Sequence, residues 1–122
     1  MPLGTYTALK NLINTTLRNV IKQVLGQDAM ETITICEDEN ISSGVEASLK
    51  AYKRWTLYLK AAGAINVTIK LYDGSEYHEI DESPISFSSA GSRVLSMGYD
   101  AYKIKLTGSN TTAVTARVVG VF

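Results

Sequence analysis

The 122-residue sequence contains one cysteine, one histidine and two prolines, and its net charge is zero. A single cysteine excludes an intramolecular disulfide, and with it the stapled frameworks of small secreted domains. Twelve Lys and Arg balance twelve Asp and Glu, so no net field attracts phosphate groups, and we expect neither nucleic acid nor an anionic membrane as a partner. A neutral protein also repels its own copies weakly, which mildly favours self-association.

Long apolar runs are absent as well. No run approaches the ~20 residues that span a bilayer, and residues 1–10 lack the charged and apolar regions of a secretory signal. We therefore expect no membrane insertion and no secretion signal, and folding in the cytoplasm. The hydrophobic fraction of 45%, with 20% charged residues, is typical of a folded domain, and the length allows one hydrophobic core.

Residue types that carry catalysis are scarce. His78 is the only histidine and Cys36 the only cysteine, whereas zinc sites usually draw on several such ligands and nucleophilic catalysis needs a nucleophile with a base. Cys36 ends an alternating Thr-Ile stretch and is predicted to be a buried strand thiol. His78 is predicted to be an exposed or half-buried strand residue. We expect no enzyme, no cofactor and no catalytic residue.

Two acidic clusters, residues 37–40 and 79–82, could supply oxygen ligands to calcium. Neither has the ligand spacing of a known calcium loop, and both lack the glycine that turns an EF-hand loop. Solvent-exposed carboxylates are the simpler interpretation. No metal site is therefore assigned, and a bound calcium ion stays a minor alternative.

The N-terminal segment predicts an amphipathic helix over residues 5–25. Its apolar side chains recur at steps of three and four, which places them in one stripe on a helix. A hydroxyl of Thr5 or Thr7 can cap the start of the helix, and Gly26 suits the left-handed position just past its end.

The opposite face of this predicted helix is basic. It carries Lys10, Arg18 and Lys22, and no acidic residue occurs in residues 1–27. Two interpretations stay open: a solvated face on a helix that packs over its own sheet, or an arm that docks on an acidic partner or a sister subunit. Further apolar residues widen the stripe towards a second contact. Together with the basic residues they give six interface candidates: Lys10, Leu12, Arg18, Ile21, Lys22 and Leu25.

After Gly26 the hydrophobic pattern changes to strict alternation, which predicts β-strands. The predicted strands are residues 32–36, 54–60, 65–72, 77–80, 85–88, 93–97, 102–106 and 112–121. Asp73-Gly74 predicts a tight hairpin turn. About eight short strands, with turns every ~8 to 12 residues, predict a mostly β protein. Its N-terminal amphipathic α-helix or arm (residues 1–27) precedes an antiparallel β-sandwich, jelly-roll-like or Ig-like (residues 28–122).

Tyrosines are the remaining recognition feature. Five of them could line an exposed face, although some must belong to the core: Tyr52, Tyr58, Tyr72, Tyr99 and Tyr102. Alternation turns Tyr58 and Tyr72 outward, with Asn66 and Thr68 as hydrogen-bonding neighbours on the same face. An aromatic platform with nearby amides suits a sugar ring, and it suits a subunit contact equally well.

The basic helix (residues 10–25) and the Thr-rich strands (residues 55–72 and 102–122) together resemble the small accessory proteins of tailed-phage virions. This resemblance covers most of the chain. It implies a capsid decoration, head-fibre or tail-associated subunit that forms a homo-oligomer, binds a capsid or other assembly protein, and enters the virion in the host cytoplasm. A non-enzymatic structural subunit is therefore the first hypothesis.

Residues 66–80 support a second resemblance. A strand, the Asp73-Gly74 turn and an aromatic return strand are similar to hairpins of discoidin-like and carbohydrate-binding sandwiches. This resemblance implies the alternative function, a carbohydrate-binding module that uses the exposed tyrosines Tyr58 and Tyr72, with a glycan as its partner.

Overall fold

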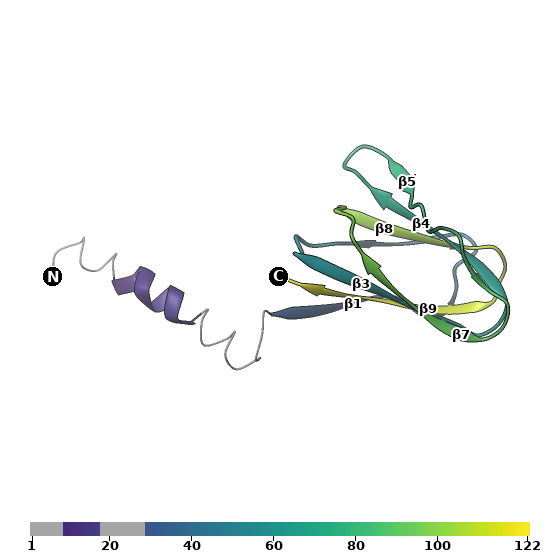
Figure 1. Ribbon diagram of the computed structural model, residues 1–122, viewed down its shortest axis with the longest axis horizontal. Helices are drawn as coiled ribbons and strands as arrows, with labels where there is room; N and C mark the ends of the chain where they lie inside the picture. The colour runs from purple at the N-terminus through teal and green to yellow at the C-terminus, as the bar shows by residue number, and fades with distance from the viewer. Residues whose placement is uncertain (1–8, 18–28) are drawn as a thin grey trace. The chain divides into compact units, whose positions relative to one another are not determined.

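The computed structural model describes residues 9–17 and 29–122 (Figure 1). The chain divides into two units, Met1–Met30 and Glu31–Phe122. In the first unit, residues 9–17 are helical, as predicted, and all their side chains are exposed. The rest of the predicted helix lies outside the described residues, together with Arg18, Ile21, Lys22 and Leu25. Within the described residues, no helix combines the length and the apolarity that crossing a bilayer requires.

Nine strands are present in the described residues. They are β1 (Met30–Asn40), β2 (Val45–Ser48), β3 (Arg54–Ala61), β4 (Ile65–Tyr72), β5 (Tyr77–Glu79), β6 (Ile85–Phe87), β7 (Gly91–Met97), β8 (Lys103–Gly108) and β9 (Ala113–Val121). One sheet has the strand order β1-β9-β3-β7. The other has the order β2-β8-β4-β5, with β6 paired to β4. Figure 1 shows the sheets as two facing layers, so this part of the chain is a β-sandwich.

Most connections pass from one sheet to the other. The chain crosses between sheets from β1 to β2, from β2 to β3, from β3 to β4, and again at each step from β6 to β9. In an Ig sandwich the first two strands share a sheet, whereas a jelly roll winds its strands between two sheets. Of the two sandwich types that the sequence leaves open, the strand order matches the jelly roll.

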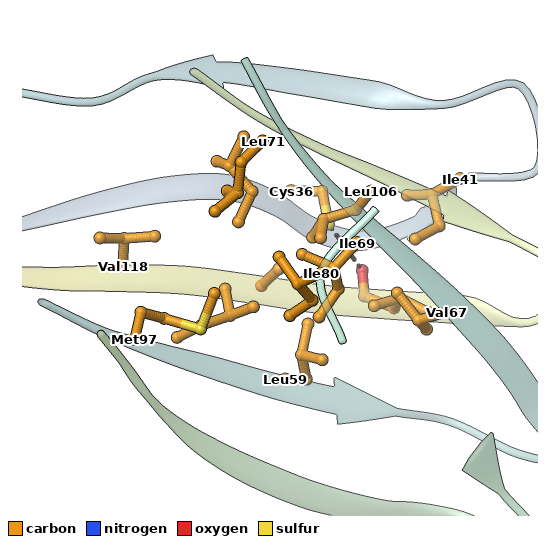
Figure 2. Packing of buried hydrophobic residues seen from close by; sticks show 14 of the residues in the cluster. Cys36, Ile41, Leu59, Val67, Ile69, Leu71, Ile80, Met97, Leu106 and Val118 are labelled. Atoms are coloured by element: carbon orange, nitrogen blue, oxygen red, sulfur yellow. Dashed lines mark hydrogen bonds between the residues drawn. The ribbon is translucent and has the colours of Figure 1, made fainter. Parts of the chain in front are cut away.

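The core lies between the two sheets and follows the predicted alternation. In β3 the buried side chains are every second residue from Trp55 to Ala61, and in β4 they are every second residue from Ile65 to Leu71. Figure 2 shows Leu59 and Val118 from one sheet gathered with Ile69 and Leu106 from the other. Burying one such side chain contributes roughly 1.5–3 kcal/mol, so this double layer is the main source of stability.

Cys36 is buried in this core, as predicted. Its thiol donates a hydrogen bond to the carbonyl oxygen of Val114 on β9, with 3.4 Å between sulfur and oxygen. Burial raises the pKa of the thiol, which keeps it protonated and unreactive. Cys36 therefore acts as a small core residue.

The predicted strands need two corrections. Val45–Ser48 forms β2, which the sequence analysis missed because Val45 and Ala47 are its only apolar residues and alanine does not favour strands. The first strand spans Met30–Asn40 and not residues 32–36, because exposed charged residues continue it along the edge of its sheet. The other strands differ from their predicted bounds by at most two residues at either end. The predicted hairpin is confirmed: β5 pairs back on β4, and Gly74 has a φ angle of +102°.

Candidate functional site

Tyr58 and Tyr72 lie in different sheets, so the predicted platform that combines them is wrong. Tyr58 lies on β3, where it is 44% exposed and pairs with Arg117 on one side and Val94 on the other. Tyr72 ends β4 in the second sheet, the strand that also carries Asn66 and Thr68. The chain crosses between layers after β3, and the two outward faces are therefore opposite surfaces of the sandwich.

The side chains of neighbouring residues contact the Tyr72 ring and cover part of it. The Tyr72 and Tyr77 ring centroids lie 5.1 Å apart, and the Nζ atom of Lys103 lies 5.4 Å from the Tyr72 centroid. Lys105 Nζ lies 5.7 Å from the Tyr77 centroid. The Tyr77 hydroxyl is covered and has no hydrogen-bond partner among the described residues. Burial, and then the nearby Glu46 carboxylate, raise the pKa of Tyr77. These contacts leave Tyr72 half-buried and poorly placed for stacking.

Tyr102 is the most exposed tyrosine of the described residues, at 66%. Its backbone is nevertheless fixed, since its N–H donates to the Tyr72 carbonyl oxygen (3.0 Å) and its own carbonyl oxygen accepts from the Leu49 N–H (2.8 Å). These bonds join the start of β8 to the ends of β4 and β2. The ring lies close to Gly74, where an added Cβ atom would come within 3.1 Å of it. An exposed ring is thus held by a rigid frame.

Two hollows open at this end of the sandwich. The first has a volume of about 220 Å³, and its polar lining consists of Tyr72, Asp73, His78, Glu79, Asp81, Tyr99 and Asp100. The second has a volume of about 350 Å³, and its polar lining consists of Lys50, Asp73, Asp100 and Tyr102. Both are lined by Asp73 and Asp100, so the two hollows adjoin. Together with these residues they form what we call the end site.

Asp73 is held in one orientation by the hairpin turn. Its Oδ1 atom accepts hydrogen bonds from the backbone N–H groups of Ser75 (2.7 Å) and Glu76 (2.8 Å). Its Oδ2 atom lies 2.8 Å from Nε2 of His78. The two backbone hydrogen bonds, followed by the contact with His78, lower the pKa of Asp73 to about 2. The carboxylate is therefore ionised at neutral pH.

The other walls of the end site are also fixed by hydrogen bonds. The Tyr99 hydroxyl donates to Oε2 of Glu82 (2.8 Å), which raises the pKa of Tyr99, and the Tyr99 carbonyl oxygen accepts from the indole N–H of Trp55 (2.8 Å). Lys50 pairs with Glu31, at 2.7 Å from Nζ to Oε1, and this contact raises the pKa of Lys50. The site is therefore prearranged and predominantly acidic.

The structure brings together some of the predicted residues and separates others. Tyr72, Tyr99 and Tyr102 reach the end site, and so do Glu79 and Asp81 of the second acidic cluster. The first acidic cluster lies elsewhere, beside a hollow that Arg117 also lines. His78 is exposed, as predicted.

Sequence reasoning missed three residues of the end site, which are Lys50, Asp73 and Asp100. Asp73 belongs to the Asp73-Gly74 dipeptide, which indicated a turn but no site. Asp100 follows Tyr99 in a connection between strands and carries no pattern at all.

The predicted interface residues of the N-terminal helix stay predictions. Lys10 and Leu12 are exposed, and the other four candidates lie outside the described residues. The virion subunit, the homo-oligomer and the capsid partner likewise stay predictions.

No family model and no curated protein matches the sequence. Among solved structures, one similar fold is the family 32 carbohydrate-binding module from C. perfringens NanJ in complex with galactose, with 12% identity over 75% of this chain and 92% of that chain and a TM-score of 0.44. Another is a protein of Bacillus endospore appendages, which form disulfide-linked pili, with 10% identity over 79% and 91% of the two chains and a TM-score of 0.47.

A third is the CBM32 of AlyQ in complex with 4,5-unsaturated mannuronic acid, with 18% identity over 72% of this chain and 92% of that chain and a TM-score of 0.36. The chain is thus similar to carbohydrate-binding modules and to a pilus protein. At these TM-scores and identities the likeness is no argument for a function, which has to be derived from the residues of the end site.

Proposed function

We propose that this protein is a non-catalytic carbohydrate-binding module and that its ligand binds at the end site. One observation carries the proposal: the exposed ring of Tyr102 lies beside a hollow of about 350 Å³ that is also lined by the carboxylates of Asp73 and Asp100. A saccharide offers an apolar ring face, which stacks on an aromatic side chain, and hydroxyl groups, which donate hydrogen bonds to carboxylates.

The prearranged geometry favours binding because little conformational entropy is lost when the ligand arrives. The Tyr102 backbone is held at both its N–H and its carbonyl group, and Asp73 is held by two backbone N–H groups. A sugar would therefore meet groups that already have their final orientation.

The charge of the end site selects the class of saccharide. Four carboxyl groups line the first hollow, from Asp73, Glu79, Asp81 and Asp100. The one lysine of the second hollow, Lys50, is paired with Glu31. An anionic sugar would be repelled by this surplus of negative charge. The proposed ligand is therefore a neutral or amino sugar and not a uronic acid.

The proposal can be tested with a glycan array and then with calorimetry of the full chain against the saccharide found. We expect Tyr102→Ala to weaken binding about tenfold, since the loss of one stacking contact costs roughly 1.4 kcal/mol. Tyr58→Ala is the matched control, because Tyr58 is an exposed tyrosine on the opposite sheet, and it should leave the affinity unchanged. An array without a hit, or equal losses in the two variants, would contradict the proposal.

A further inference from the structure

The hairpin between β4 and β5 gathers three side chains that metal ions use as ligands. Asp73, Glu76 and His78 belong to one short stretch, and the turn at Gly74 brings them to the same place. The turn is closed by a hydrogen bond from the Asp73 N–H to the Glu76 carbonyl oxygen (3.1 Å). His78 is the only histidine in the sequence, and it lies beside two carboxylates.

The distances between these side chains are close to those around a single ion. Nε2 of His78 lies 2.8 Å from Oδ2 of Asp73 and 3.5 Å from Oε1 of Glu76. One ligand atom from each residue lies within 4.8 Å of the other two. Zinc binds nitrogen and carboxylate oxygen at about 2.0–2.2 Å, which places the ligand atoms of a tetrahedral site roughly 3.3–3.6 Å apart. Small side-chain adjustments would bring all three atoms into that range.

The mixture of donor atoms distinguishes this cluster from the other acidic groups of the chain. Calcium and magnesium take oxygen ligands, whereas an imidazole nitrogen together with carboxylate oxygens suits zinc. The acidic residues 37–39 include no nitrogen donor. The Oδ1 atom of Asp73 already accepts two backbone hydrogen bonds. These bonds orient the carboxylate so that Oδ2 is the atom available to a metal ion, just as hydrogen bonds from surrounding groups orient the ligands of known metal sites.

We propose that Asp73, Glu76 and His78 form a zinc site at the rim of the end site. Their side chains are 48%, 72% and 57% exposed, in that order, so the ion can enter without a change in the fold. Three protein ligands leave one tetrahedral position open. Asp73 and His78 also line the first hollow, so an oxygen atom of a ligand bound there can occupy the open position.

Zinc titration of the metal-free full chain, without a histidine tag, tests this site. Calorimetry should give one zinc ion per chain, and cobalt used as a probe should give the absorption of a tetrahedral complex. We expect His78→Ala and Glu76→Gln each to weaken zinc binding by about tenfold or more. Asp81→Asn is the matched control, because this carboxylate lines the first hollow but is no member of the cluster. It should leave zinc affinity unchanged.

Three results would overturn the zinc site: no zinc bound, equal losses in Asp81→Asn and His78→Ala, or calcium competing with zinc on equal terms. The outcome is separate from that of the carbohydrate proposal, because the titration contains no saccharide. A glycan array without a hit, together with one zinc ion bound per chain, would contradict the proposed function and support the zinc site.

Discussion

The Tyr52 ring is buried against Gly120, which has no side chain and so leaves room for it. An added Cβ atom at Gly120 would overlap the Tyr52 ring, closer than atoms can approach. Gly120 belongs to β9 and pairs with Trp55 of β3, so this stretch of backbone has little freedom to move away. The ring also packs against Phe122, with 5.1 Å between the centroids.

We therefore expect Gly120→Ala to destabilise the protein by about 1–3 kcal/mol, the usual cost of forcing extra volume into a packed core. Gly98→Ala is the control, because no atom lies within 4 Å of a Cβ atom added at Gly98. It should change the free energy of unfolding by no more than about 0.5 kcal/mol. Urea unfolding of both variants measures the difference. Similar values for the two would show that Tyr52 moves aside without cost.

At the scale of elements, the β4–β5 hairpin is controlled by the charge of Asp73. The ionised carboxylate accepts two backbone hydrogen bonds in the turn, and the pKa of Asp73 is lowered from 3.8 to about 2. A carboxyl group whose folded-state pKa is lowered adds stability above its unfolded-state pKa, and this stability is lost as the pH falls through the folded-state pKa. The turn should therefore be fully ordered above about pH 4 and loosen towards pH 2.

Amide chemical shifts of Ser75 and Glu76 in a pH titration with a chelator present should show this transition, with a midpoint near pH 2. The Asp73→Asn variant should not show it. The chain contains its own control, since the Ser42 and Thr112 N–H groups donate to the side-chain oxygens of Asn40 and Asn110, which do not ionise. A midpoint at the ordinary carboxyl pKa of 3.8 would contradict the role of these hydrogen bonds.

At the scale of the whole molecule, the two units carry opposite charge. Residues 1–30 contain three Lys and Arg and one Asp, which is +2, and the remaining nine basic and eleven acidic residues of 31–122 sum to −2. Every buried core side chain of the described residues lies between Cys36 and Val121. Core formation therefore uses the second unit, and we predict that the opposite charges of the two units let copies of the chain associate.

Deletion of residues 1–27 tests both statements. We expect the shortened chain to unfold within a few degrees of the full chain, because its core is intact, and to sediment as a monomer. The full chain should self-associate, less so at high salt because salt screens exposed charges. Thermal unfolding and analytical ultracentrifugation measure the two effects. An unfolded truncated chain, or a full chain that stays monomeric at high concentration, would contradict this expectation.

The sequence by itself determined the local features of the fold. Alternation in β3 and β4 predicted which side chains are buried, since neighbouring residues of a strand point to opposite faces whatever the strand pairs with. The burial of Cys36 and the hairpin at Asp73-Gly74 followed from equally local preferences. Such features depend on a few neighbouring residues and can therefore be read from them.

Only the tertiary structure decided which strands share a sheet and which loops meet. After β3 the chain crosses to the other sheet, where the Ala64 carbonyl oxygen accepts hydrogen bonds from Asn110 (2.9 Å) and Thr112 (3.2 Å). These partners are 46 and 48 residues away along the chain. The same crossings separate Tyr58 from Tyr72. Strand ends from distant parts of the chain meet at one end of the sandwich, and this brings together Asp73, Asp100 and Tyr102. No pattern in the local sequence indicates which strand ends meet.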